Sequence, residues 1–181
     1  MIYRVLGIDP GSHHLGIGCV EKSGHQIRLV HADILHAPAK AGFYERLEIL
    51  SAKLNPLVDK LNPHQVAVED IFAAKNPRSA FRLGVARGVA VASCLGRGIQ
   101  IAEYAPSQVK VAVTGYGRAD KTQVQKMVRM ILGAKLDLGF DATDALAVAI
   151  CHVNSGALSG WVSTRKSSVE KSGDATNHSG K

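Results

Sequence analysis

A short apolar strand that ends in a carboxylate, Leu6-Gly7-Ile8-Asp9-Pro10-Gly11-Ser12, decides the fold of this chain. The residues after Asp9 are turn formers, so the strand stops there. A second apolar strand, Val66-Ala67-Val68-Glu69, also ends in an acid. If the two strands are parallel neighbours, both carboxylates meet at the carboxyl edge of one sheet, where sheets with crossover helices hold their ligands and catalytic groups. The pattern predicts an acidic site on an α/β fold.

The rest of the chain supplies more strands and the helices that cover them. Turn residues separate apolar runs that predict five strands, at 3–8, 16–21, 26–35, 66–69 and 99–103. Apolar residues at three- and four-residue spacings predict helices at 43–61, 79–95, 108–113, 121–132 and 141–153. The first three strands read as a meander, and strands then alternate with helices. This order predicts an α/β fold with a five-stranded mixed sheet flanked by helices.

Length and composition indicate one domain followed by a tail. The chain has 181 residues, of which 46% are hydrophobic, enough for one well-buried domain over residues 1–158. Residues 159–181 are rich in serine, glycine and basic residues. They have too few apolar side chains to offset the entropy of ordering. We expect a disordered basic tail there.

Charge and cysteine content narrow the class of protein. The net charge of +7 suits a nucleic-acid partner, although a merely basic soluble protein has the same signature. The three cysteines are far apart and form no Cys-x-x-Cys motif, so we expect reduced, buried thiols. The N-terminus shows no secretory signal, and the uncharged stretch 145–164 is too polar for a membrane span. We expect a cytoplasmic protein with no membrane partner.

Two more acids, Asp141 and Asp144, open a predicted helix three residues apart and so share one helical face. With Asp9 and Glu69 they can form one cluster of hard oxygen ligands, which suits Mg²⁺ or Mn²⁺. Two such ions about 3.5–4 Å apart can activate a water and stabilise a departing 3′ oxygen at a phosphodiester. Each acid alone has a simpler interpretation: a turn former at Asp9, a solvated strand end at Glu69, a helix cap at Asp141.

Five segments in order resemble the motifs of the RuvC Holliday-junction resolvases, over about residues 3–153. One such motif would be weak evidence, because the first resembles the opening strand of the wider ribonuclease H-like superfamily, actin-like ATPases included. Five in register are specific. The segments are Gly7-Ile8-Asp9-Pro10-Gly11-Ser12, Glu69-Asp70-Ile71-Phe72-Ala73-Ala74-Lys75-Asn76, Glu103-Tyr104-Ala105 with Gln108-Val109-Lys110, Lys121-Thr122-Gln123-Val124-Gln125, and Asp141-Ala142-Thr143-Asp144-Ala145-Leu146-Ala147.

The resemblance implies a ribonuclease H-like fold, a homodimer, and an endonuclease that resolves four-way DNA junctions by paired symmetric nicks in homologous recombination and DNA repair. It implies two Mg²⁺ ions per active site, for which Mn²⁺ can substitute, and 5′-phosphate and 3′-hydroxyl ends. The family's catalytic, metal-binding acids map onto Asp9, Glu69, Asp141 and Asp144. The implied protein partners are RuvA and RuvB, which drive branch migration. Small residues in the helix at 79–95 favour close packing on the sheet or a dimer seam.

Six more residues are candidates for contact with DNA: Phe72, Lys75, Arg78, Lys110, Arg118 and Lys121. The family's basic pair maps onto Lys110 and Lys121, near the scissile phosphate or the junction backbone. Phe72 can stack on or wedge between unpaired bases while neighbouring cations hold phosphates. The alternatives are that Phe72 continues its strand into the core and that the lysines are ordinary solvated side chains.

Three other functions fit parts of the sequence. An actin-like or sugar-kinase-like phosphotransferase would need a second domain with a second phosphate loop, for which 181 residues leave no room. A nuclease that acts on RNA/DNA hybrid depends on 2′-hydroxyl contacts that the sequence does not reveal. A non-catalytic junction-binding module is disfavoured, because four acids would weaken its affinity for a polyanion.

Overall fold

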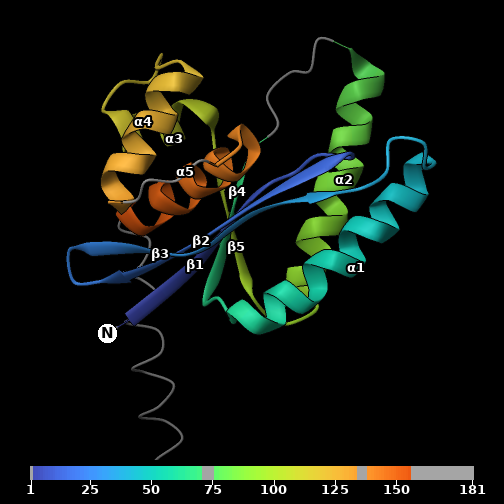
Figure 1. Ribbon diagram of the computed structural model, residues 1–181, viewed down its shortest axis with the longest axis horizontal. Coiled ribbons are helices and arrows are strands. Elements are labelled where there is room, and N and C mark those ends of the chain that lie inside the picture. Colours follow the sequence, from blue (N-terminus) through green and yellow to red (C-terminus); the bar gives the residue numbers. More distant parts are fainter. Residues whose placement is uncertain (1, 71–75, 134–137, 156–181) are drawn as a thin grey trace, which may run out of the picture.

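A five-stranded mixed sheet lies between two groups of helices (Figure 1). The computed structural model describes residues 2–70, 76–133 and 138–155. The described strands and helices match the predicted ones, and their ends differ by at most two residues. In chain order they are β1 (Ile2–Asp9), β2 (His14–Ser23), β3 (Gln26–His36), α1 (Phe43–Leu61), β4 (Gln65–Glu69), α2 (Pro77–Leu95), β5 (Gln100–Tyr104), α3 (Pro106–Thr114), α4 (Lys121–Leu132) and α5 (Phe140–Asn154).

The sheet has the strand order β3-β2-β1-β4-β5. β2 pairs antiparallel with β1 and β3, which confirms the meander. β4 is parallel to both β1 and β5, and such pairs need a long crossover connection, here supplied by α1 and α2. The parallel neighbours that the two acid-ending strands require are therefore β1 and β4. Their ladder pairs Ile8 with Val68, one residue before each acid.

Each face of the sheet buries its own core, because successive side chains of a strand point to opposite faces. Val5 and Ala67 pack in the core on the α5 side, together with residues of α3 and α4. Leu6, Ile8 and Val66 pack in the core on the other side, with the apolar stripe of α1 and with α2. The sheet therefore separates α3, α4 and α5 from α1 and α2, as Figure 1 shows.

Glycines let α5 lie unusually close to β1 and β2. A Cβ atom on Gly18 would lie 2.5 Å from the backbone nitrogen of Leu146, far inside ordinary contact distance. Cβ atoms on Gly7 and Gly16 would overlap the backbone carbonyls of Ala145 and Asp141. Gly7 and Gly18 are direct partners in the β1–β2 ladder. Because these three positions lack a side chain, α5 packs directly against the backbone of β1 and β2.

Other expectations concern the cysteines, the membrane and the tail. Cys19, Cys94 and Cys151 are free and buried, as expected, and burial raises the pKa of each thiol to about 11 or 12. Among the described helices, none is long and apolar enough to cross a membrane. Residues 156–181 lie outside the described residues, so the boundary between 1–158 and 159–181 stays a prediction.

Candidate active site

Asp9 and Glu69 end neighbouring parallel strands and project from the same face of the sheet. Val5 packs toward α5, and Asp9 lies an even number of residues further along β1, so its side chain falls on that face too. Ala67 places Glu69 on the α5 side of β4 by the same alternation. Both acids directly follow a paired position of the two strands. The strand pattern alone therefore brings two carboxylates together under α5.

The first turns of α5 bring the other two acids to this edge. The backbone carbonyl of Asp141 lies against Gly16, whose ladder partner is Asp9. Asp144 follows one turn later and carries a side chain that is 20% exposed. The N-cap of α5 is Gly139, so the alternative interpretation of Asp141 as the cap is wrong. Both acids lie near the positive end of the helix dipole, which favours negative charge.

Three of the four acids line one cavity of about 320 Å³, which we call the acidic cavity. Asp9, Glu69 and Asp144 face Lys110 and Lys121 across it. Asp141 is not among its lining residues, although its charge still acts on Asp9. The remaining lining residues form an apolar wall: Pro106, Val109, Val124 and Ala147. Strands β1 and β4 and helices α3, α4 and α5 thus all contribute to one polar hollow with a partly apolar lining.

The acids of this cavity are held in an environment that disfavours their charge. Burial first, and then repulsion by Asp144, Asp141 and Glu69, together raise the pKa of Asp9 to about 7. Burial and then Asp144 also raise the pKa of Glu69. Lys121 opposes both shifts. A partly buried cluster of this kind gains stability from any cation that it binds.

Lys121 supplies one such cation from the chain itself. Its ammonium group donates to Asp144 Oδ2 at 3.1 Å, and this bond raises the lysine's pKa. The same nitrogen lies 5.9 Å from the ring centroid of Phe140, a cation–π distance. Lys121 is the first residue of α4, and Asp120 caps that helix, accepting from the Gln123 N–H at 2.8 Å. The cap therefore fixes the backbone from which the lysine reaches the acids.

The donor set fits a hard divalent cation. Its ligands are carboxylate oxygens, the type that Mg²⁺ and Mn²⁺ prefer, and the raised pKa of Asp9 shows that the cluster favours added positive charge. In the described part of the chain, no three side chains of His, Cys, Asp or Glu stand close enough together to hold one ion. The fit thus rests on ligand type and on charge, with Lys121 bound to one of the acids.

Of the six residues predicted to contact DNA, two line the acidic cavity, two are exposed elsewhere, and two lie outside the described residues. Lys110 and Lys121 line the acidic cavity. Arg118 is exposed in the loop between α3 and α4. Arg78 is exposed in the first turn of α2, where its N–H bonds to the Asn76 cap at 2.9 Å. Phe72 and Lys75 lie outside the described residues, so their roles stay predictions.

A buried polar network at the C-terminal end of α5, away from the acidic cavity, was not foreseen. His152 Nε2 lies 2.6 Å from Gln65 Oε1, and its Nδ1 lies 2.7 Å from the Tyr104 hydroxyl. Because the amide oxygen only accepts, His152 donates from Nε2 and accepts at Nδ1. Burial lowers the pKa of His152 to about 4, so the ring is neutral at neutral pH. The network ties α5 to β4 and β5 and carries no mobile proton.

Sequence reasoning also missed the glycines that seat α5. Gly7, Gly16 and Gly18 carry no chemistry, yet they set how far Asp141 and Asp144 stand from the strand ends. A signal was present, because glycines inside strands often mark a close backbone approach. By contrast, nothing in the sequence marked Val109 as part of the cavity wall.

Comparisons with known proteins place the chain in a family. Residues 5–152 match the family model described as crossover junction endodeoxyribonuclease RuvC. The protein of that name from Trichlorobacter lovleyi is 47% identical over 157 residues, covering 86% of this chain and 87% of its own length. Its counterpart from Geobacter sulfurreducens is 45% identical, covering 86% and 94%.

Solved structures agree with these sequence matches. A structure described as T. thermophilus RuvC in complex with Holliday junction substrate superposes with a TM-score of 0.81 at 33% identity, covering 87% of this chain and 96% of that one. The yeast mitochondrial resolvase Ydc2, 15% identical with a TM-score of 0.59, shares the fold, covering 82% and 77%. The fold is therefore ribonuclease H-like, as the resemblance implied. The chain belongs to the RuvC family of crossover junction endodeoxyribonucleases.

Proposed function

We propose that this protein resolves four-way DNA junctions by paired symmetric nicks in homologous recombination and DNA repair. The observation that carries the proposal is the convergence of Asp9, Glu69 and Asp144 with two lysines in one cavity, in a chain of this family. The similarity to a RuvC bound to a Holliday junction supports this substrate. A surplus of basic residues supports binding to a polyanion.

The cofactor that we propose is Mg²⁺, two ions per site, with Mn²⁺ as a substitute. Asp9, Glu69, Asp141 and Asp144 would hold the ions, since they are the carboxylates that act on one another's charge. Bound there, the metal supplies Lewis-acid chemistry that lowers the pKa of a water and neutralises charge at the leaving 3′ oxygen, which gives 5′-phosphate and 3′-hydroxyl ends. The chain's own part is to hold the carboxylates of Asp9, Glu69 and Asp144 in a partly apolar hollow, within electrostatic reach of Asp141.

The two lysines of the cavity bind the scissile phosphate in this proposal. Lys121 is 70% exposed at its side chain while bonded to Asp144, so its ammonium can reach a substrate oxygen. Transfer of Lys121 from Asp144 to a phosphate would free that carboxylate for the cation. Lys110 lies on α3 and also lines the cavity. The lysines thus complement the phosphate's charge while the acids complement the cation's.

A cleavage assay tests the proposal. Four-way junction, linear duplex and RNA/DNA hybrid are incubated with Mg²⁺ and wild-type protein, Asp144→Asn or Asp33→Asn. Asp33 lies on β3, the far edge strand of the sheet, and serves as a matched control. We expect paired nicks in the junction alone, lost in Asp144→Asn and kept in Asp33→Asn. Tight junction binding without cleavage would leave a binding module, and preference for the hybrid would leave a ribonuclease.

The segment 71–75 and the nearby cations form the proposed junction-opening element. Phe72 would stack on unpaired bases, with Lys75 and Arg78 on phosphates, and Arg118 would contact the backbone near the cavity. The exposure of Arg78 and Arg118 supports their part. Phe72→Ala is expected to lower junction cleavage while leaving the melting temperature unchanged. An equally active variant would remove Phe72 from the mechanism.

We also propose a homodimer, because two symmetric cuts match a two-fold assembly. One face of α2 supports this: Cβ atoms on Gly84 and Gly88 would meet nothing within 4 Å, and Phe81 is 65% exposed. Ala86 and Ala90 on the other face are buried against the domain. Sedimentation should show a dimer that Phe81→Glu weakens. Tyr44→Glu, at a 74% exposed position of α1, is the control.

Two remaining proposals follow from family membership. The protein would act with RuvA and RuvB during branch migration, and it would do so in the cytoplasm, where bacterial DNA lies. Co-sedimentation with the two proteins on a junction is the direct test. If the rate of junction resolution were the same with and without RuvA and RuvB, that result would argue against cooperation.

A further inference from the structure

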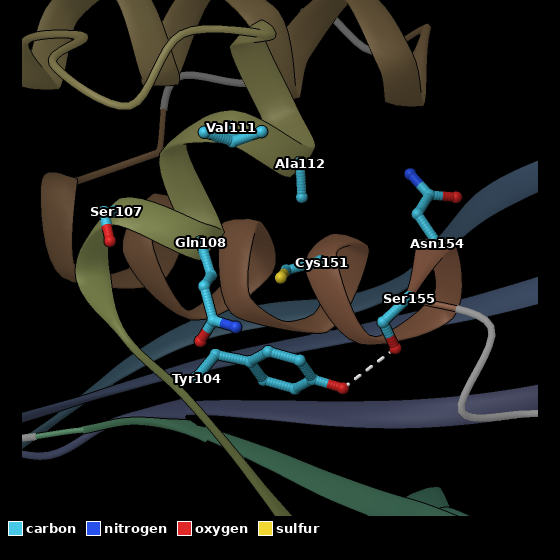
Figure 2. Close-up of a pocket in the computed structure, with 8 residues that line it drawn as sticks. All are labelled: Tyr104, Ser107, Gln108, Val111, Ala112, Cys151, Asn154 and Ser155. Carbon is cyan, nitrogen blue, oxygen red and sulfur yellow. Dashed lines mark hydrogen bonds between the residues drawn. The ribbon is translucent and has the colours of Figure 1, made fainter.

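Figure 2 shows the residues of a second cavity, of about 380 Å³. The α3 residues that line it differ from those that line the acidic cavity and lie on the opposite face of the helix. We call this second cavity the α3–α5 groove. Tyr104 from β5, Val111 and Ala112 from α3, and Cys151 from α5 contribute its mainly apolar lining, and Asn154 and Ser155 stand at one end. Its volume is in the range of ordinary ligand pockets. No residue of the proposed chemistry contributes to it.

The groove leaves apolar surface uncovered by the described residues. Val111 is 52% exposed, although it belongs to a helix whose neighbours Val109 and Val113 are buried. The Tyr104 hydroxyl lies 3.0 Å from Ser155 Oγ and 2.7 Å from His152 Nδ1, so this polar group of the groove already has hydrogen-bond partners. A mainly apolar groove gains free energy when an apolar segment covers it.

We propose that residues 157–162 of this same chain dock in the α3–α5 groove, so that the disordered tail expected at 159–181 would begin only after Val162. Ser155 is both the last residue described and part of the groove, so the chain continues from its rim. The segment Ala157-Leu158-Ser159-Gly160-Trp161-Val162 has three large apolar side chains, whereas residues 163–181 are polar and basic apart from isolated small or β-branched residues. At about 3.5 Å per residue, Trp161 can reach roughly 20 Å from Ser155, which itself lines the groove.

The chain's own segment has an advantage over an occupant in trans. Closing a loop of a few residues carries a small entropic penalty, and a tethered segment acts at an effective concentration in the millimolar range. Binding of a second copy or of another protein would also carry the entropic cost of lost translational freedom. The position of the apolar residues immediately after α5, and not further along the tail, is the pattern that docking in cis requires.

Docking would also brace the acidic cavity, because both cavities share α3. Val109 and Lys110 face the acidic cavity, and Val111 and Ala112 face the groove. A segment docked in the groove would therefore contact the face of α3 opposite Lys110 and restrict the movement of this helix. This consequence depends only on the position of α3 and not on the chemistry proposed for the acids.

The only tryptophan in the chain is Trp161, so its fluorescence reports on the segment directly. We expect native full-length protein to emit at shorter wavelength, and to be quenched less by acrylamide, than the protein in concentrated guanidinium chloride. Val111→Gln should shift the emission toward the unfolded value. Met130→Gln, at a 64% exposed position of α4 outside the groove, is the matched control and should leave it unchanged.

A second pair of variants gives an independent readout. Trp161→Ser should lower the melting temperature of the full-length protein, since it removes the segment's largest buried side chain. Val169→Ser, further along the tail, should not. Native emission equal to that of the unfolded chain would overturn the proposal, as would equal responses to Val111→Gln and Met130→Gln. An emission shift that grows with protein concentration would instead assign the groove to a second copy and overturn docking in cis.

Discussion

Replacing Gly18 by alanine tests whether the close approach of α5 positions the acidic site. The added Cβ would lie 2.5 Å from Leu146 N, 2.7 Å from Leu146 Cα and 2.8 Å from Ala145 C, all backbone atoms that cannot rotate away. Ordinary contacts are about 3.5 Å or longer, so α5 must retreat by about 1 Å. Overpacking of this kind costs about 1–3 kcal/mol of stability. The three atoms nearest the added Cβ belong to Ala145 and Leu146 and not to Asp141 or Asp144, so we expect any effect on activity to act through the helix.

The effect on catalysis should exceed the effect on folding. A shift of about 1 Å in groups that position a reaction can lower its rate on the order of 100-fold. Urea unfolding followed by circular dichroism gives the stability change, and junction cleavage with Mg²⁺ gives the rate. Gly96→Ala is the matched control. Gly96 is exposed with φ −60°, and its Cβ would meet its nearest neighbour at an ordinary 3.5 Å.

The control should be neutral or slightly stabilising, by about 0.4–1 kcal/mol, because alanine restricts the unfolded chain. The reasoning is refuted if Gly18→Ala unfolds at the same urea concentration as Gly96→Ala. A destabilised Gly18→Ala variant that cleaves at the wild-type rate would separate helix packing from the site. That result would show that the catalytic arrangement of the acids does not depend on how closely α5 packs against the sheet.

Three further predictions concern the acidic cavity. Without divalent cations, the pKa of Asp9 is about 7 in the folded state against 3.8 in the unfolded state, so between these pH values the folded protein keeps a proton that the unfolded chain releases. The contribution of Asp9 to the free energy of unfolding is therefore complete below pH 4 and falls by on the order of 4 kcal/mol as the pH rises to about 7. Urea titrations should find this pH dependence absent in Asp9→Asn. Mg²⁺ should raise the melting temperature of wild type but much less that of Asp9→Asn, and calorimetry showing equal shifts would contradict the assigned ligands. Lys121→Met should lose up to about 1 kcal/mol without Mg²⁺, since its ion pair with Asp144 is largely exposed. Mg²⁺ should restore that stability but not the cleavage rate.

Local patterns were enough to predict the elements of this fold. Apolar alternation and turn residues located β1 to β3, and helical spacing located α1 and α4. These signals are short-range: a residue's side-chain preference and its neighbours within four positions decide them. The parallel pairing of β1 with β4 was inferable as well, because both strands end in an acid after an apolar run.

Side-chain contacts between elements that are far apart in the chain could not be predicted from the sequence. The bond between Lys121 and Asp144 joins two helices through tertiary packing, and nothing near either residue marks it. The network of Gln65, Tyr104 and His152 likewise joins β4, β5 and α5. Which side chain meets which across such distances depends on how far apart the elements pack, a quantity that periodicity does not contain.

The sequence by itself determined the strands and helices and the family to which the chain belongs, and it singled out the four acids as candidate oxygen ligands. Tertiary structure alone decided that Asp9, Glu69 and Asp144 share one cavity with two lysines, and that α3 separates this cavity from a second, apolar one. The physical reason is that secondary structure follows from local torsional and hydrophobic preferences. The spacing of α5 from the sheet follows from steric contact across it, which Gly7, Gly16 and Gly18 permit.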